Sequence, residues 1–470
     1  MKNFGTKQDG FVFVYVSAML IVIMLSVIYA FNAGQISNEK TRLQNTADAV
    51  AYSVASVAAR DLNFKAYTNR AMVANQVLVA QMMSTLSWLR MAETLIARVD
   101  TVDGWVPYPT NLVEQLRRSL GSLGEGIYQD IDILATQANE VNQTLSGSQI
   151  LMHEAGVAIA WETFNAIVDE NDSTINKRML LTQVNEMDSF VDQLELLTQP
   201  YNLALEGESG NETLLNKEKI EQLRDVTMAS RDGFTSRRTY DWYEDSTPCA
   251  LGAVFKRAGG TELVGADETM PYFTWAAMDT LSMSLQTYED CEPTQTVEIA
   301  LASGVAQASS TEQMTGYQPS SELFGNSWQV NLNASADAVN RYEHDRSGDF
   351  TTVSAGLKQY YDFVKKGLID EIAGVTVFLA KPHGEDALST YKHTDFYAES
   401  SNLDIASEGD MIKSRIGAFS KAVPYFSRPN DVAYFSRRDA SQREYGNLYN
   451  PFWQTRLDAI DDDKTELVGL

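Results

Sequence analysis

The stretch FVFVYVSAMLIVIMLSVIYAF, residues 11–31, decides how this chain is organised. It contains no charged residue, proline or glycine, and as a helix it is long enough to span the roughly 30 Å hydrocarbon core of a bilayer. A cleaved signal peptide is the alternative, but the apolar part of such a peptide is only about 7 to 15 residues long. We therefore expect an uncleaved transmembrane helix.

Basic residues set the expected orientation of this helix. Lys2, Lys7 and the amino terminus precede it, and only Asp9 offsets them. Because basic flanks stay on the cytoplasmic side, residues 1–10 are expected to form a cytoplasmic tail. The bulk of the chain is then expected outside the membrane.

The next part, residues 32–103, is predicted to be one long helix, or two in series, that continues the membrane segment. No glycine or proline occurs between Gly34 and Gly104, and VDGWVPYP at 102–109 ends the helical pattern. Within this part an apolar stripe recurs at spacings of three and four residues. Its members are Leu43, Ala47, Val50, Val54 and Val57. The stripe is predicted to be a helix interface, either with a later helix of the same chain or with another protein.

Four polar residues interrupt the apolar pattern farther along the same helix: Asn69, Arg70, Asn75 and Gln76. They suit either hydrogen bonds between helices or a solvated face. The pattern favours the solvated face.

The remainder of the chain predicts an α+β fold. Helical periodicity over 112–143, 149–168 and 178–197 indicates a helical bundle or stalk in residues 110–205. From about residue 240, short β-prone runs are separated by Gly, Ser, Asn and Pro. The runs are TVEIALAS (296–303), SWQVNLNAS (327–335) and GVTVFLA (374–380). Residues 240–470 are therefore expected to form a mixed α and β head domain.

Composition and motifs argue against several classes of function. The 37 basic and 63 acidic residues give a net charge of -26, which repels nucleic acid. The four histidines do not form a His-Glu-x-x-His motif, and neither a Gly-x-Ser-x-Gly elbow nor a Gly-Lys-Ser/Thr phosphate loop occurs. We expect no enzymatic activity, no cofactor and no metal site.

Cys249 and Cys291 are the only cysteines, and both fall in the part expected outside the membrane. A disulfide between them is predicted, with two separate thiols as the alternative. The acidic triplets at 243–245 and 288–290 lie beside the cysteines. Their carboxylates could bind Ca²⁺, but a solvated acidic surface is favoured.

Aromatic residues gather near the end of the sequence, in NLYNPFWQTRL at 447–457. Tyr449, Phe452 and Trp453 surround Pro451 there. The segment is predicted to be either a set of buried aromatic side chains that closes the domain or a docking patch for a partner.

Two regions carry a resemblance to a known family. RLQNTADAVAYSVA (42–55) and YTNRAMVANQ (67–76) follow the membrane segment, and KAVPYFSRP (421–429) precedes the aromatic segment. This layout resembles the TadE/TadG-like proteins of the tight-adherence (Flp type) pilus system. The resemblance implies a pilus assembly protein that spans the bacterial inner membrane once, with a cytoplasmic N-terminus and a periplasmic bulk. Its expected partners are membrane lipid, other pilus assembly proteins or pilin subunits, with oligomeric assembly as a further expectation.

The chain departs from the family pattern in two places. Gly10 precedes the apolar segment as in prepilins, but the fifth residue after it is Tyr15 where prepilins have Glu, so processing is not expected. Some long members carry a von Willebrand factor A domain with an Asp-x-Ser-x-Ser metal motif, and the nearest match here, DENDST at 169–174, has the wrong spacing. We therefore expect a long TadG-like protein without that domain. The alternatives are a minor pilin within the fibre, a surface adhesin or a metal-binding periplasmic protein.

Overall fold

The computed structural model divides into two compact units, and each is described by itself. The first comprises Met1–Phe64, Met152–Thr198 and Phe363–Leu470, and the second comprises Lys65–Leu151 and Gln199–Asp362. The structure describes residues 9–99, 110–173, 175, 198–201, 211–244, 252–265, 273–289, 292–308, 330–344, 357–364, 372, 374–382, 415–428 and 444–460.

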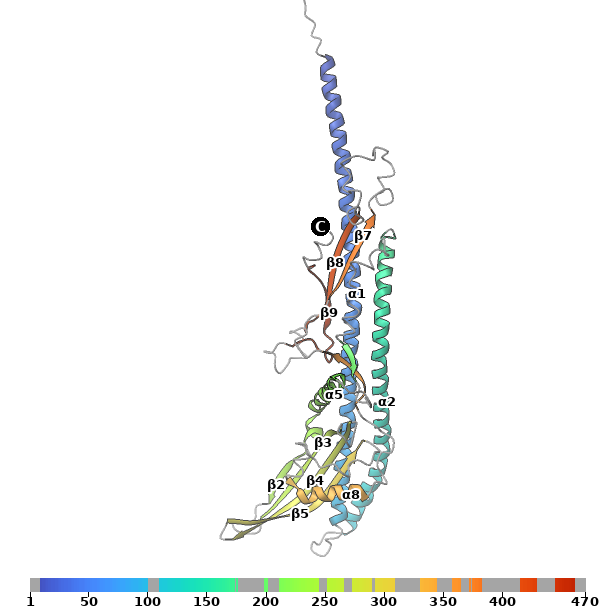
Figure 1. Cartoon of the computed structure of the whole chain (residues 1–470). Coiled ribbons are helices and arrows are strands. Elements are labelled where there is room, and N and C mark those ends of the chain that lie inside the picture. Colours follow the sequence, from blue (N-terminus) through green and yellow to red (C-terminus); the bar gives the residue numbers. More distant parts are fainter. Residues whose placement is uncertain are drawn as a thin grey trace, which may run out of the picture. The chain divides into compact units, whose positions relative to one another are not determined.

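Two long helices dominate the described chain (Figure 1). Helix α1 (Asp9–Val99) is continuous over 91 residues, so the predicted membrane helix does continue into a long helix. Helix α2 (Thr110–Asn171) merges the first two segments predicted after residue 110, and their separation was wrong. Between those segments Ser148 donates its hydroxyl to the carbonyl of Leu145, within the same helix. The third predicted segment, 178–197, lies outside the described residues, and β1 (Thr198–Tyr201) follows it.

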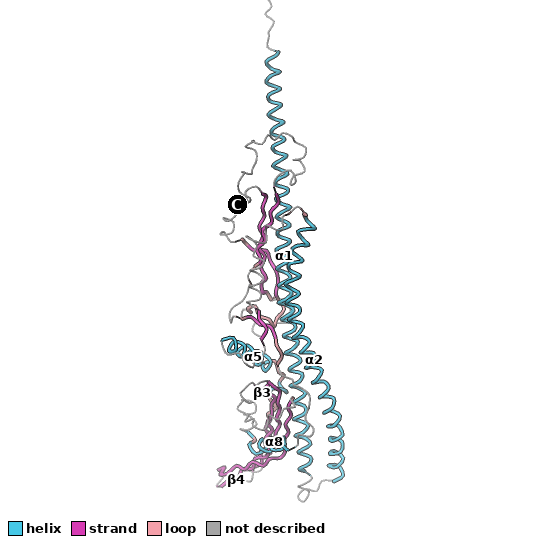
Figure 2. Tube along the Cα trace, turned by 45° about the vertical axis from the view of Figure 1, so that its right-hand side comes forward, coloured by secondary structure: helices cyan, strands magenta, loops and turns pink. Residues whose placement is uncertain are grey.

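The first unit packs parts of α1 and α2 with a three-stranded antiparallel sheet (Figures 1 and 2). The strands β7 (Val375–Pro382), β8 (Arg415–Phe426) and β9 (Trp453–Asp458) lie in the order β7-β8-β9. The predicted strand at 374–380 is therefore confirmed as β7. The rings of Phe378 and Phe419, which are paired in register, lie 4.5 Å apart between centroids. This sheet joins the apolar faces of both helices in one hydrophobic core.

The second unit contains a four-stranded antiparallel sheet in the order β2-β3-β4-β5. Its strands are β2 (Tyr240–Glu244), β3 (Gly252–Gly265), β4 (Phe273–Glu289) and β5 (Glu292–Gln307). The helices α5 (Asn211–Ala229), α6 (Gly233–Ser236) and α8 (Leu332–His344) and the strand β6 (Tyr360–Phe363), which pairs with β1, complete it. The predicted strand at 296–303 is confirmed as part of β5.

The run 327–335 was predicted to be β-structure, and its second half is wrong because α8 begins at Leu332. Glu298 on β5 accepts hydrogen bonds from the backbone amides of Asn333 and Ala334, at 3.1 and 3.3 Å. A carboxylate at this place satisfies amides that have no partner inside the first turn of a helix. A side chain distant in sequence thus favours the helix over the local β propensity.

Helix α1 covers the outer edge of β5. Arg90 donates a hydrogen bond to the carbonyl of Val305, and Arg98 donates one to the carbonyl of Ala300, at 2.5 and 2.6 Å. A Cβ atom on Gly304 would collide with the backbone of Ser87 and Met91, so glycine permits this close approach. Unpaired strand edges invite pairing with other chains, and the two arginines satisfy this edge from within the chain.

The compact units cut across the predicted domains. The predicted head, residues 240–470, contributes its part up to Asp362 to the second unit and its part from Phe363 to the first. The α+β class is confirmed, whereas a bundle or stalk at 110–205 stays a prediction.

Candidate functional site

The N-terminal part of α1 exposes an unbroken apolar surface. From Val12 to Phe31, sixteen large apolar side chains are 36 to 75% exposed. This is the one segment of the described residues that is long and apolar enough to cross a membrane, and none of its most apolar window is buried. Each such side chain gains on the order of 1 kcal/mol when it leaves water, so this surface favours lipid over solvent.

The two serine hydroxyls in this part of α1 are satisfied within the helix. Ser17 donates its hydroxyl to the carbonyl of Val14 at 3.0 Å, and Ser26 donates its hydroxyl to the carbonyl of Val22 at 2.8 Å. A hydrocarbon environment offers no hydrogen-bond partner, so internal satisfaction is what a spanning helix requires. The segment is therefore suited to span a membrane.

The predicted helix interface lies in the core of the first unit. Leu43, Ala47, Val50, Val54 and Val57 are at most 7% exposed. They share one hydrophobic cluster with Ala160, Phe164 and Val168 of α2 and with residues of β7 and β8. Of the two predicted alternatives, the structure supports packing within the chain, and the stripe is not open to another protein.

The contact between His153 and Asp61 fixes the register of α1 against α2 in this unit. The Nδ1 atom of His153 lies 3.0 Å from Oδ2 of Asp61, and both side chains are buried. One turn along α2, a Cβ on Gly156 would lie 3.9 Å from the Cβ of Asp61, an ordinary contact. The helices are antiparallel, since Asn171 lies near Thr46 at the other end of the packed region.

Polar side chains of α1 also form hydrogen bonds with the backbone of the three-stranded sheet. Asn63 accepts a hydrogen bond from the backbone amide of Trp453 at 3.0 Å and donates one to its carbonyl at 2.8 Å. Gln44 donates to the carbonyl of Phe419 at 2.6 Å. The helix therefore forms hydrogen bonds with the backbone of two strands, β8 and β9.

The predicted docking patch belongs mostly to the core. Trp453 is 3% exposed, and its ring lies 5.6 Å from that of Phe363 and 5.5 Å from that of Phe426. Phe452 packs against the same cluster, and Tyr449 is half-buried. The structure supports the alternative of buried aromatic side chains that close the domain.

Comparison with known protein families finds a match for the N-terminal part of α1. The family model described as "Putative Flp pilus-assembly TadE/G-like" matches residues 10–59. Residues 10–59 are a TadE/G-like segment. No curated protein and no solved structure matches the chain. The predicted relationship to Flp pilus-assembly proteins is confirmed, while the motifs at 67–76 and 421–457 lie outside the match and stay predictions.

The TadE/G-like segment thus consists of the apolar surface and the helix face that forms the core. Past its end, the structure contradicts the favoured prediction of a solvated face. Asn69 and Gln76 are buried, and Gln76 accepts a hydrogen bond from Nε1 of Trp275 at 2.9 Å. Asn69 accepts one from Gln149 on α2 at 2.7 Å and donates one to the carbonyl of Tyr361.

The two other polar interruptions differ from each other. Asn75 donates a hydrogen bond to Asn142 on α2 at 3.0 Å, which confirms the alternative of bonds between helices. Arg70 is exposed, as predicted for a solvated face.

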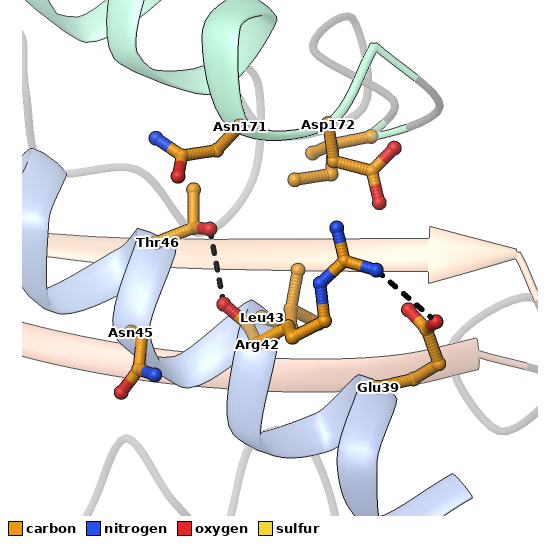
Figure 3. A pocket seen from close by; sticks show the side chains of 8 residues that line it. Glu39, Arg42, Leu43, Asn45, Thr46, Asn171 and Asp172 are labelled. Carbon is orange, nitrogen blue, oxygen red and sulfur yellow. Dashed lines mark hydrogen bonds and ion pairs between the residues drawn. The ribbon is translucent and has the colours of Figure 1, made fainter. Parts of the chain in front are cut away.

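A small cavity lies beside the TadE/G-like segment, where the C-terminal end of α2 approaches α1 (Figure 3). Its volume is about 150 Å³. Arg42, whose side chain is 60% exposed, lies 3.6 Å from Glu39, and Thr46 donates its hydroxyl to the carbonyl of Arg42. Asn171 and Asp172 form the opposite wall. The described lining holds no nucleophile paired with a base, so the cavity does not indicate catalysis.

Sequence analysis missed a buried ionic cluster in the second unit. The guanidinium of Arg238 lies 2.8 Å from Oδ2 of Asp279, and the two side chains are 2% and 0% exposed. Ser87 on α1 donates a hydrogen bond to the same carboxylate at 2.5 Å. This cluster joins α1 to β4 and is fully enclosed, so its role is to hold the unit together. Residues 192 positions apart in the chain give no local signal of such contact.

A second buried pair, Lys219 and Asp362, lies at 3.0 Å. Burial, and then the nearby charge of Asp362, raises the pKa of Tyr201 to about 12. The phenol therefore stays neutral at any physiological pH.

Cys249 and Cys291 lie outside the described residues, so the disulfide stays a prediction. Asp245 and Asp290 of the acidic triplets lie outside them too. In the part of the chain that the structure describes, no three His, Cys, Asp or Glu residues gather in a way that could hold a metal ion.

Proposed function

We propose that this protein is a membrane-anchored assembly component of a tight-adherence (Flp type) pilus. The apolar part of its TadE/G-like segment spans the bacterial inner membrane once, with the N-terminus in the cytoplasm and the chain after Phe31 in the periplasm. The observation that carries the proposal is the exposed apolar surface of α1, which lies inside the matched residues 10–59. The stretch has no other cover within the described chain.

The proposed mechanism is protein-protein binding, without turnover. Anchoring restricts the protein to two dimensions and raises the effective concentration of partners in the same membrane. The apolar face of the TadE/G-like segment beyond the membrane is used inside the chain, so partners must bind other surfaces. Pilin subunits and other pilus assembly proteins are the proposed partners.

A pair of substitutions in the membrane segment tests the proposal. Val22→Arg with Leu25→Arg places two charges near the centre of the apolar surface, where each costs about 2.5 to 3.5 kcal/mol on insertion. We expect the variant to leave the carbonate-resistant membrane fraction and the cells to lose pili in electron micrographs. The matched control, Val22→Leu with Leu25→Ile, should keep both the membrane localisation and the pili.

The outcome separates the proposal from its alternatives. An arginine variant that stays in the membrane fraction and keeps its pili, as the control does, would contradict the proposed anchor. Mass spectrometry of the mature N-terminus addresses the minor pilin. If the mature chain begins at Phe11 and copurifies with fibres, the protein is a minor pilin and not an anchored assembly component.

A further inference from the structure

The exposed charges of α1 and α2 in the first unit have opposite signs. On α1 between Asn32 and Phe64, the exposed charged side chains are Lys40, Arg42 and Arg60, all basic, while Glu39 and Asp48 are half-buried. On α2 from Met152 to Asn171, they are Glu154, Glu162, Asp169 and Glu170, all acidic. Arg42 and Arg60, about five helical turns apart, lie on one side of α1, and a basic face is unexpected in a chain of net charge -26.

The opposite charges also lie at matching levels along the two antiparallel helices. Arg60 precedes Asp61, and Glu154 follows His153, so the contact between Asp61 and His153 places both exposed charges at one level. At the other end, the cavity brings Arg42 level with the residues that follow Glu170. Within the described chain, neither Arg60 nor Glu154 forms an ion pair.

Between these charges, each face offers apolar or small groups. Tyr52 on α1 is 47% exposed, and Ile159 on α2 is 43% exposed. Ala155 and Ala158 are exposed beside Ile159 and leave room for a large side chain. Tyr52 thus lies between Arg42 and Arg60 along α1, and Ile159 lies between Glu154 and Glu162 along α2.

We propose that the basic face of α1 in one copy docks on the acidic face of α2 in a second copy. The proposal rests on the proposed membrane anchor, because copies held in one membrane by the same segment stand at the same height. Arg60 then meets Glu154 of the neighbour without any vertical shift, and Tyr52 lies opposite the surface around Ile159. The partner is a second copy of this chain, identified by charge complementarity.

A symmetric contact is disfavoured by the same charges. If two α1 faces met, basic side chains would lie against basic side chains. If two α2 faces met, acidic side chains would lie against acidic side chains. The contact is therefore head-to-tail, using different surfaces on the two copies, and it can extend into a ring or a row within the membrane.

Photocrosslinking of the full chain in native membranes tests this contact. With p-benzoylphenylalanine in place of Tyr52, we expect a crosslinked homodimer whose second peptide contains α2 residues near Ile159. Arg60→Glu and Glu154→Arg should each lower the dimer yield by about threefold or more, and the double reversal should restore it. Arg237→Glu, an exposed reversal in the second unit, serves as the matched control.

Three outcomes would overturn the proposal: no homodimer, a crosslink to α1 of the second copy, or a crosslink to a different protein. A double reversal that does not restore the dimer would also overturn it. The membrane fraction is measured in the same samples, so loss of the anchor is distinguished from loss of the contact. Circular dichroism of each purified variant confirms that these surface changes leave the fold intact.

Discussion

Asn63 on α1 pairs with the backbone of Trp453 on both sides, in the way that a neighbouring strand would. Its amide group accepts from the nitrogen of Trp453 and donates to the oxygen, at 3.0 and 2.8 Å. One side chain of the long helix thereby holds the start of β9 against the core of the first unit.

Loss of this pairing should destabilise the first unit. Asn63→Ala leaves an amide and a carbonyl of Trp453 without partners, and we expect a cost of about 2 kcal/mol, which lowers the thermal melting midpoint of the full chain in detergent. Asn63→Asp keeps the acceptor oxygen, so its melting midpoint should lie between those of the wild type and Asn63→Ala. Asn165→Ala, which removes only an exposed bond within α2, should change the midpoint little. Equal midpoints for the alanine variants at 63 and 165 would contradict the assignment.

The close approach of β5 to α1 predicts opposite effects at two glycines of the second unit. Gly304→Ala adds a Cβ that collides with the backbone of α1, so we expect a lower melting midpoint. Gly147→Ala adds a Cβ in open space within α2, where alanine is favoured by about 0.5 to 1 kcal/mol. Melting curves of the two variants should therefore move in opposite directions. A tolerated alanine at 304 would exclude the close approach.

The enclosed ion pair of the second unit should be sensitive to removal of one partner. Arg238→Met leaves the carboxylate of Asp279 buried without its main counter-charge, and breaking such a pair costs about 3 to 5 kcal/mol. The neighbouring exposed Arg237→Met should change stability by less than about 0.5 kcal/mol. Tryptophan fluorescence during thermal denaturation gives the melting midpoints of the two variants. Similar midpoints would show that the ion pair contributes nothing to stability.

Asp232, the N-cap of α6, gives a pH-dependent prediction. Burial alone would raise its pKa, but hydrogen bonds from Gln81, Thr235 and Phe234 lower the pKa to about 2. Because this folded-state pKa is below the unfolded value of about 3.9, the stabilisation is complete above pH 4 and is lost as the pH falls towards 2. Asp232→Asn keeps a capping side chain that does not titrate.

The measurement is the melting midpoint of wild type and Asp232→Asn between pH 5 and pH 2.5. Wild type should lose more stability than the variant over this range. Parallel curves would show that the carboxylate is not held in its charged form by these hydrogen bonds.

The sequence was sufficient for features that depend on local pattern. The absence of glycine and proline between Gly34 and Gly104 predicted most of α1, and the spacing of Leu43, Val50 and Val54 predicted its buried face. Whether that face packs within the chain or against a partner could not be decided locally. The answer depends on Phe164 and Phe419, which lie more than a hundred residues away.

Polar contacts were the main failure of prediction. A polar side chain on a helix is usually solvated, and the partners that bury Asn69 and Gln76, namely Tyr361 and Trp275, come from other elements. The helical start at Leu332 was missed for the same reason, since Glu298 supplies its cap. The cluster around Asp279 likewise forms only after distant segments have packed.

The account depends most on the apolar segment of α1 being held in a membrane with the chain that follows it outside. Protease treatment of spheroplasts, before and after lysis, tests this directly with an antibody against the C-terminal residues. The account predicts that the full-length band disappears in intact spheroplasts while a cytoplasmic marker survives. Survival of the full-length band until the cells are lysed would contradict it.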